Sequence, residues 1–176
     1  MGVRGMKNGV KRIACLTLAV LMFACAWGCG ANTEQSDDGP DVDMAALMDA
    51  MVAADATLPE MVSVTGEGEL AAQDFTYLSD LDYKLIDTYF YVYAEAGTAE
   101  EIAVIKLKDA GQAAAAMNSL HKHIEARQGT FREYDPEQLP LTENAVIIRE
   151  GRYVALIVCE KNGLVQNVFR DSFKES

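Results

Sequence analysis

The chain has 176 residues, half of them hydrophobic, and its 15 Lys and Arg against 27 Asp and Glu give a formal net charge of −12 at pH 7. Binding to nucleic acid depends on basic side chains that neutralise phosphates, so this composition argues against a nucleic-acid partner. It also offers nothing to anionic lipid headgroups.

The first 28 residues are typical of a bacterial export signal. Four basic residues precede an uncharged stretch of 16 residues from Ile13 to Gly28, namely Arg4, Lys7, Lys11 and Arg12. A basic start, a short apolar region and small residues at its end form the pattern of a cleaved secretory signal. The stretch is shorter than the ~20 apolar residues of a spanning helix, so we expect cleavage rather than a transmembrane anchor.

The segment Ala26-Trp27-Gly28-Cys29 resembles a bacterial lipobox, in which small residues precede a lipid-modified cysteine. Trp27 departs from the small residue usual at its position, and Phe23-Ala24-Cys25 is an alternative with one small residue before its cysteine. Two acyl chains are enough for stable anchoring without a basic patch. We therefore expect lipid on Cys29 to hold the protein at the extracytoplasmic face of the cell membrane.

Residues 29–42 are polar and acidic, which predicts a flexible tether ahead of a single α+β domain over 43–176. Without residues 1–28 the chain keeps 11 basic and 27 acidic side chains, a formal net charge of −16. Cys159 is the one cysteine left for the folded domain. It ends an apolar run that starts at Tyr153, so we expect a buried thiol and no disulfide.

The predicted domain begins with a helix over about 43–55, where Met and Leu recur at three- and four-residue spacing. A short extended piece follows at Met61 to Val64. The next residues, Gly66-Glu67-Gly68, begin a formal dinucleotide-binding pattern. We reject that interpretation because Glu67 would repel a pyrophosphate and no parallel βαβ unit surrounds the motif.

Two apolar runs, 85–94 and 102–107, predict an antiparallel hairpin around Gly97. Tyr89, Tyr91 and Tyr93 share one face of the first strand, because successive side chains alternate. This tyrosine face is a possible binding face. A face covered by a helix is the other interpretation.

Asp109 and Gln112 form a capping-box pattern that predicts a helix to about Gln128, ended by Gly129. His121 and His123 on this helix are two residues apart and point in different directions. They cannot ligate one metal ion as an i, i+4 pair can, and we expect both to be surface residues.

A short turn before Pro140 leads into a second hairpin over 144–149 and 152–159, followed by a helix with Asn162 as its cap. A further strand after Asn162-Gly163 is the alternative. The order is then one or two N-terminal helices followed by ββαββα. This predicts an α+β fold with one antiparallel sheet of about four strands and helices packed on one face.

From Met44 to Phe173 the chain resembles DUF4358, a family of bacterial lipoproteins defined by a domain of unknown function. The likeness is carried by Glu101-Ile102-Ala103-Val104-Ile105-Lys106, by Ile124 to Gln128, by Phe131 with Tyr134-Asp135-Pro136-Glu137, and by Gly151-Arg152-Tyr153-Val154. The resemblance implies a lipid-anchored extracytoplasmic domain. It implies no activity and no functional residues.

The sequence contains no nucleophile elbow, no zinc-ligand motif and no cofactor motif, so we expect no catalytic residue, metal or cofactor. The favoured function is a non-catalytic binding module with an unknown protein or small-molecule ligand. The alternative is a cell-envelope hydrolase, which needs paired carboxylates. Its candidates are Asp80, Asp82, Asp87, Glu100 and Glu101.

Overall fold

The computed structural model describes residues 39–174. The expected signal peptide (1–28), Cys29 and the expected tether as far as residue 38 lie outside this range. The described residues form one antiparallel sheet with strand order β1-β2-β3-β5-β4. The strands are β1 (Met61–Thr65), β2 (Ile86–Ala94), β3 (Glu101–Leu107), β4 (Val146–Glu150) and β5 (Tyr153–Val158). The helices are α2 (Met44–Ala53), α3 (Ala71–Phe75), α4 (Ala113–Tyr134), α5 (Leu139–Glu143) and α6 (Asn162–Asp171).

The α+β class and the single antiparallel sheet are confirmed, but the sheet has five strands rather than four. The additional strand is β1, the short extended piece expected at Met61 to Val64. It pairs antiparallel with β2, with Met61 opposite Ala94 and Thr65 opposite Phe90. A strand of five residues is too short to give a strong periodic pattern. Whether it joins the sheet also depends on a partner strand that lies further along the chain.

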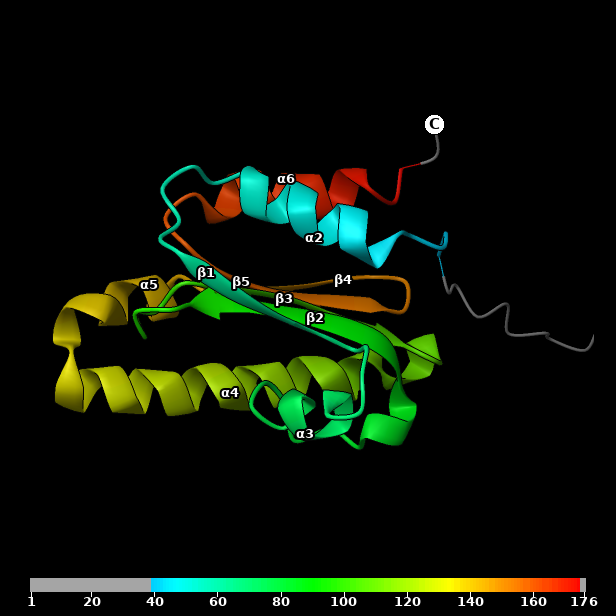
Figure 1. Ribbon diagram of the computed structural model, residues 1–176, viewed down its shortest axis with the longest axis horizontal. Coiled ribbons are helices and arrows are strands. Elements are labelled where there is room, and N and C mark those ends of the chain that lie inside the picture. Colours follow the sequence, from blue (N-terminus) through cyan, green and yellow to red (C-terminus); the bar gives the residue numbers. More distant parts are fainter. Residues whose placement is uncertain (1–38, 175–176) are drawn as a thin grey trace, which may run out of the picture. The chain divides into compact units, whose positions relative to one another are not determined.

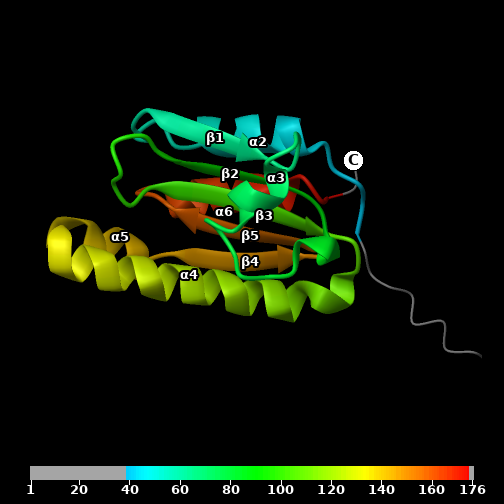
Figure 2. The same ribbon diagram turned by 60° about the horizontal axis from the view of Figure 1, so that its bottom comes forward.

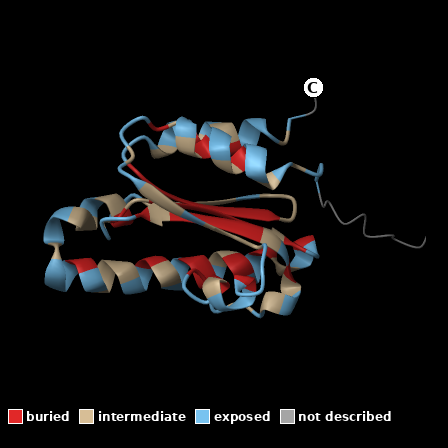
Figure 3. Ribbon diagram, in the orientation of Figure 1, coloured by how far each residue is buried: buried red, intermediate tan, exposed pale blue. Residues whose placement is uncertain are grey.

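Helices cover both faces of the sheet rather than the one face expected, as Figure 1 shows. Helices α3 and α4 pack on one face, while α2 and α6 pack on the other. The reason is visible in β3, where Ile102 and Val104 enter one core and Ala103 and Ile105 enter the other. Strands buried on both faces are apolar throughout rather than alternating, and Figure 3 shows the resulting buried central strands.

Helix α4 is longer than expected, since it continues through Gly129 to Tyr134. The end of the helix is set by Pro136, because the residue before a proline disfavours helical backbone. Asp135 accordingly has an extended φ of −153° while its N–H donates to the carbonyl of Phe131. A single glycine inside such a long helix weakens it without ending it.

The expected helix near the C-terminus is confirmed as α6, and the strand alternative is wrong. Its predicted cap is also wrong. Asn162 lies within the helix, and its side-chain amide donates to the carbonyl of Asn144 at 2.9 Å. The first expected helix is confirmed as α2, and Asp43 caps it, since its carboxylate accepts from the N–H groups of Ala45 and Ala46.

The last residues of the expected tether lie against the sheet. Asp41 forms an ion pair with Lys106 at 2.7 Å, and Lys106 also pairs with Asp87. The N–H of Val42 donates to the Tyr153 hydroxyl, which itself donates to Asp41. The chain therefore enters the fold through a network of charged and polar groups on the α2 and α6 side. Within residues 39–174, no helix has both the length and the apolar composition needed to span a membrane.

Candidate functional site

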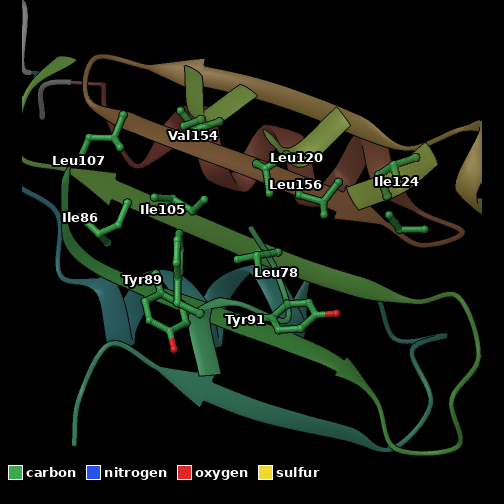
Figure 4. Close-up of a cluster of buried hydrophobic side chains, with 14 of the residues drawn as sticks. Leu78, Ile86, Tyr89, Tyr91, Ile105, Leu107, Leu120, Ile124, Val154 and Leu156 are labelled. Atoms are coloured by element: carbon green, nitrogen blue, oxygen red, sulfur yellow. The ribbon is translucent and has the colours of Figure 1, made fainter. Parts of the chain in front are cut away.

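The three tyrosines of the predicted binding face have two different roles. Tyr89 is 1 % exposed, and its hydroxyl donates to the carbonyl of Ala71 at 2.8 Å. Burial raises the pKa of Tyr89 to about 12. It belongs to the core, where Figure 4 shows it on the same strand as Tyr91. Tyr91 is 6 % exposed and belongs to the same core cluster, but it also pairs with the half-buried Tyr93, with ring centroids 5.1 Å apart, at the wall of a cleft.

We call this the tyrosine cleft. Its volume is about 540 Å³. Figure 2 shows α3 and α4 over different parts of the sheet. Tyr91 and Tyr93 belong to the core on this side of the sheet or pack against it. The cleft is lined by residues of β1, β2, α4 and the α3 region: Val64, Asp74, Tyr77, Tyr91, Tyr93, His123, Ala126, Arg127 and Thr130. Concave sites with aromatic walls and few polar groups are typical ligand-binding sites.

A buried carboxylate lies beside the cleft. Glu101 is the first residue of β3 and is fully shielded from solvent. It accepts a hydrogen bond from the Tyr91 hydroxyl at 2.7 Å, and its Oε2 lies 3.0 Å from Nε2 of His123. Arg127 Nε lies 3.3 Å from the other carboxylate oxygen, Oε1. A buried carboxylate needs such partners, because its desolvation is otherwise costly.

These contacts fix the orientation of the cleft walls. Burial raises the pKa of Tyr91 far above its usual range, and the adjacent Glu101 carboxylate raises it further. The hydroxyl of Tyr91 therefore stays protonated and donates to Glu101, while the ring is held next to Tyr93. The His123 ring meets the Tyr91 ring edge-on at a centroid distance of 6.1 Å. One wall of the cleft is thus preorganised by hydrogen bonds behind it.

The charges of the cleft are unevenly paired. Arg127 is matched by Glu101, donates to the carbonyl of Thr98 at 3.0 Å, and lies over the Phe131 ring at 5.0 Å. Asp74 on α3 also lines the cleft. No ion pair to Asp74 occurs within residues 39–174. A site with tyrosine faces and an unmatched carboxylate attracts cations.

Sequence reasoning missed His123 and Arg127. His123 is not the surface residue that was expected, since its side chain is 13 % exposed and contacts Glu101. A signal for this pair exists in the sequence. The two residues are four apart on a predicted helix and so share a face. Glu101 begins an apolar strand, where a charged residue requires a partner.

The other carboxylates considered for a hydrolase do not gather around Glu101. Asp80 pairs with Lys122 and accepts from Ser119, and these contacts lower the pKa of Asp80. Asp82 caps a short turn by accepting from the N–H of Lys84. Asp87 pairs with Lys106, whose strand position places it on the opposite sheet face from Glu101. Glu100 precedes Glu101 in the chain and is half-buried. Because successive side chains of an extended chain alternate, the two carboxylates point to opposite faces of the sheet.

Cys159 is buried, as predicted, with 3 % exposure. Burial raises the pKa of its thiol to about 12, and the neighbouring Asp55 carboxylate adds to this effect. Asp55 is itself 2 % exposed and accepts from Thr57 and from the N–H of Lys161. This group joins the end of α2 to the β5–α6 turn, and an unreactive thiol fits that structural role.

Within the described residues, no cluster of three or more His, Cys, Asp or Glu side chains has the arrangement of a metal site. Comparison with known families gives a match to the family described as Domain of unknown function (DUF4358), over residues 60–159. The match begins one residue before β1 and ends at Cys159, so it includes the whole sheet. No curated protein and no solved structure matches the chain.

Proposed function

Because the chain belongs to the DUF4358 family, whose description assigns no function, we propose a function from its own residues. The protein is a lipid-anchored extracytoplasmic binding module, tethered through Cys29, that holds a cationic group of its ligand in the tyrosine cleft. The single observation that carries the binding part of this proposal is the pairing of charges around the cleft: within residues 39–174, Arg127 is matched by Glu101, whereas Asp74 has no ion-pair partner.

The location rests on the sequence. A basic start, an uncharged stretch and the lipobox-like segment that ends at Cys29 support export and lipid modification. Only nine residues lie between Cys29 and Gly39, where the described structure begins. The domain is therefore held close to the membrane surface by a short acidic segment.

The binding role rests on the composition of the cleft. Tyr91 and Tyr93 line a wall fixed by Glu101, and Tyr77, which also lines the cleft, is 69 % exposed. The negative face of an aromatic ring attracts a cation by about 0.5–1 kcal/mol at exposed sites and by more where water is excluded. Asp74 adds a direct charge interaction. An amino or guanidino group fits this set better than an anion, because the guanidinium of Arg127 already has its carboxylate.

The geometry does not favour the hydrolase alternative. Glycoside hydrolysis requires two carboxyl groups that flank one scissile bond. Glu101 is fully shielded and holds Tyr91, His123 and Arg127, while Asp87 belongs to the network on the opposite face. A binding module without catalysis is therefore the function that the site supports best.

The location is tested by metabolic labelling of the full chain with a tagged fatty acid in a bacterial host. We expect label in the wild type and in Cys25→Ala, and none in Cys29→Ala. The mass of the mature N-terminus should correspond to a diacylated Cys29. An unacylated protein that keeps Met1 would contradict the proposal.

The binding site is tested by calorimetric titration of the full chain with tetramethylammonium. We expect saturable binding in the millimolar range, which corresponds to about 4 kcal/mol. Asp74→Asn should weaken it several-fold, since a partly exposed charge pair contributes about 1 kcal/mol. Glu133→Gln on the exposed end of α4 removes the same charge elsewhere and should have no effect. Saturable binding of acetate in place of the cation would contradict the proposal.

A further inference from the structure

Strand β1 leaves one edge of the sheet open. The N–H of Gly66 donates to the carbonyl of Tyr89, and the N–H of Glu95 donates to the carbonyl of Glu60. Antiparallel pairing alternates along a strand, so the even-numbered positions 60 to 66 bond to β2 and the odd-numbered ones point away. Met61, Ser63 and Thr65 therefore direct their backbone N–H and C=O groups outward. No other strand within residues 39–174 pairs with this edge.

A depression lies on each side of this edge. On one face is the tyrosine cleft, which Val64 lines. On the other is a groove of about 310 Å³, here called the methionine groove, lined mainly by apolar residues of α2, β1 and β2: Met48, Asp49, Val52, Ala53, Met61, Ser63 and Val92. Successive side chains of a strand point to opposite faces of a sheet. A strand added beside β1 would place alternate side chains toward the cleft and toward the groove.

The charged residues of the chain segment that contains β1 are all acidic. Residues 44–83 contain eight Asp and Glu and no Lys, Arg or His. Asp49 lies in the methionine groove and Asp74 in the tyrosine cleft, while the exposed Glu60 and Glu67 flank β1. None of these four has an ion-pair partner in the described part of the chain. The edge therefore attracts a basic segment and repels a second copy of this acidic chain.

We propose that β1 is the docking edge for an extended segment of a partner protein that alternates basic and apolar residues and adds to the sheet as a sixth strand. This inference rests on the proposed function, since a Lys or Arg of the segment supplies the cationic group in the tyrosine cleft. Apolar residues of the segment occupy the methionine groove. Backbone hydrogen bonds to Met61, Ser63 and Thr65 give affinity, and the two depressions give specificity.

The test uses the full chain in a non-ionic detergent and a labelled eight-residue peptide of alternating Lys and Val. Fluorescence anisotropy should show saturable binding, and the matched Glu-Val peptide should not bind. Ser63→Pro removes an outward N–H without removing a bond to β2, a position at which edge strands tolerate proline. It should weaken binding about tenfold through the lost hydrogen bond and the bulk of the ring. Ser63→Ala keeps the N–H and changes only the side chain that lines the methionine groove, so it should weaken binding much less than Ser63→Pro does.

Amide hydrogen exchange provides a readout specific to strand addition. The N–H groups of Met61, Ser63 and Thr65 should become protected when the Lys-Val peptide is added, and should remain unprotected with the Glu-Val peptide. Equal binding by Ser63→Pro with an unchanged fold, or binding without this protection, would overturn the proposal. Protection of the same amides by self-association, without peptide, would also overturn it by assigning the edge to a second copy.

Failure here can be separated from failure of the proposed function. If tetramethylammonium binds in an Asp74-dependent manner while the peptide does not bind, the cleft takes a cation but β1 is not a docking edge. If neither binds, both proposals are wrong. Peptide binding that depends on Ser63 but not on Asp74 would retain the docking edge and reject the cleft as the cation site.

Discussion

Glu101 and Arg127 form an ion pair behind the tyrosine cleft, with Nε and Oε1 3.3 Å apart, although the carboxylate has no exposure to solvent. The pair couples the stability of the fold to the shape of the site, because the same carboxylate holds Tyr91. Glu101→Leu should lower the free energy of unfolding by about 2–4 kcal/mol, since breaking a buried pair leaves a charge unmatched.

Chemical denaturation measures this loss, and Glu125→Gln on the exposed side of α4 should change stability by less than about 0.5 kcal/mol. In the variant that combines Glu101→Leu with Arg127→Leu, part of the loss should be recovered, because neither charge is then left without a partner. A single Glu101→Leu change as mild as Glu125→Gln would show that the pair is not part of the packed core.

The hydroxyl of Tyr91 has a separate effect. Tyr91→Phe retains the ring in the cleft but removes the hydrogen bond to Glu101, so unfolding should become easier by about 1–2 kcal/mol. Binding of tetramethylammonium should change little, because the aromatic face remains. Calorimetry and denaturation of one protein sample test both statements. Loss of cation binding without loss of stability would reverse the roles that the structure gives to ring and hydroxyl.

Stability should fall when the pH drops below about 4. Hydrogen bonds from Lys106 lower the pKa of Asp41, and those from Ser119 lower the pKa of Asp80. Burial alone would raise the pKa of Asp55, but hydrogen bonds from Thr57 and Lys161 outweigh it and the pKa is lowered. A carboxyl group whose folded pKa is depressed contributes stability above its unfolded pKa, and this contribution disappears as the group is protonated.

Thermal unfolding between pH 7 and pH 2 measures this dependence. Asp55→Asn should be less stable at pH 7 and should lose less on acidification, because one of the titrating groups is gone. Asp171→Asn, at an exposed pair with Lys174, is the control and should follow the wild-type curve. A wild-type stability that does not change down to pH 2 would contradict the assignment.

The structure explains why position 66 is a glycine, and the reason is separate from nucleotide binding. A Cβ there would lie 2.9 Å from the backbone N of Tyr89, at the end of the β1–β2 pair. Gly66→Ala should therefore lower the melting temperature by several degrees, as expected for about 1–2 kcal/mol of strain. Gly129→Ala meets no atom within 4 Å inside α4 and should raise stability by about 0.5–1 kcal/mol. Equal effects of the two substitutions would contradict this explanation.

The sequence was sufficient to predict every element that has a strong local signal. The two hairpins, the first helix near Asp43 and the long helix after Asp109 are present in the structure, and the α+β class follows from them. The differences have one local and one distant cause. The end of α4 is set by Pro136 rather than by Gly129, and β1 joins the sheet only because β2 offers an edge.

The site was harder to predict than the fold. Tyr91 and Tyr93 on the predicted face line the cleft, whereas Tyr89 on the same face does not, and alternation alone cannot separate an open end of a strand from a covered one. Glu101, His123 and Arg127 come together only when α4 packs across β3. The sequence shows that His123 and Arg127 share a helix face and that Glu101 begins a strand. It does not show that this helix face contacts this end of the strand, because that contact depends on tertiary packing.

The central claim is that the tyrosine cleft takes a cationic group, and its most direct test is the location of a bound cation. Nuclear magnetic resonance of the full chain during titration with tetramethylammonium gives this location through the ring signals of the tyrosines. We predict saturable shifts of Tyr77, Tyr91 and Tyr93, with Tyr134 on the exposed end of α4 unchanged. Shifts that do not saturate and that include Tyr134 equally would show only nonspecific attraction to an acidic surface, and would contradict the claim.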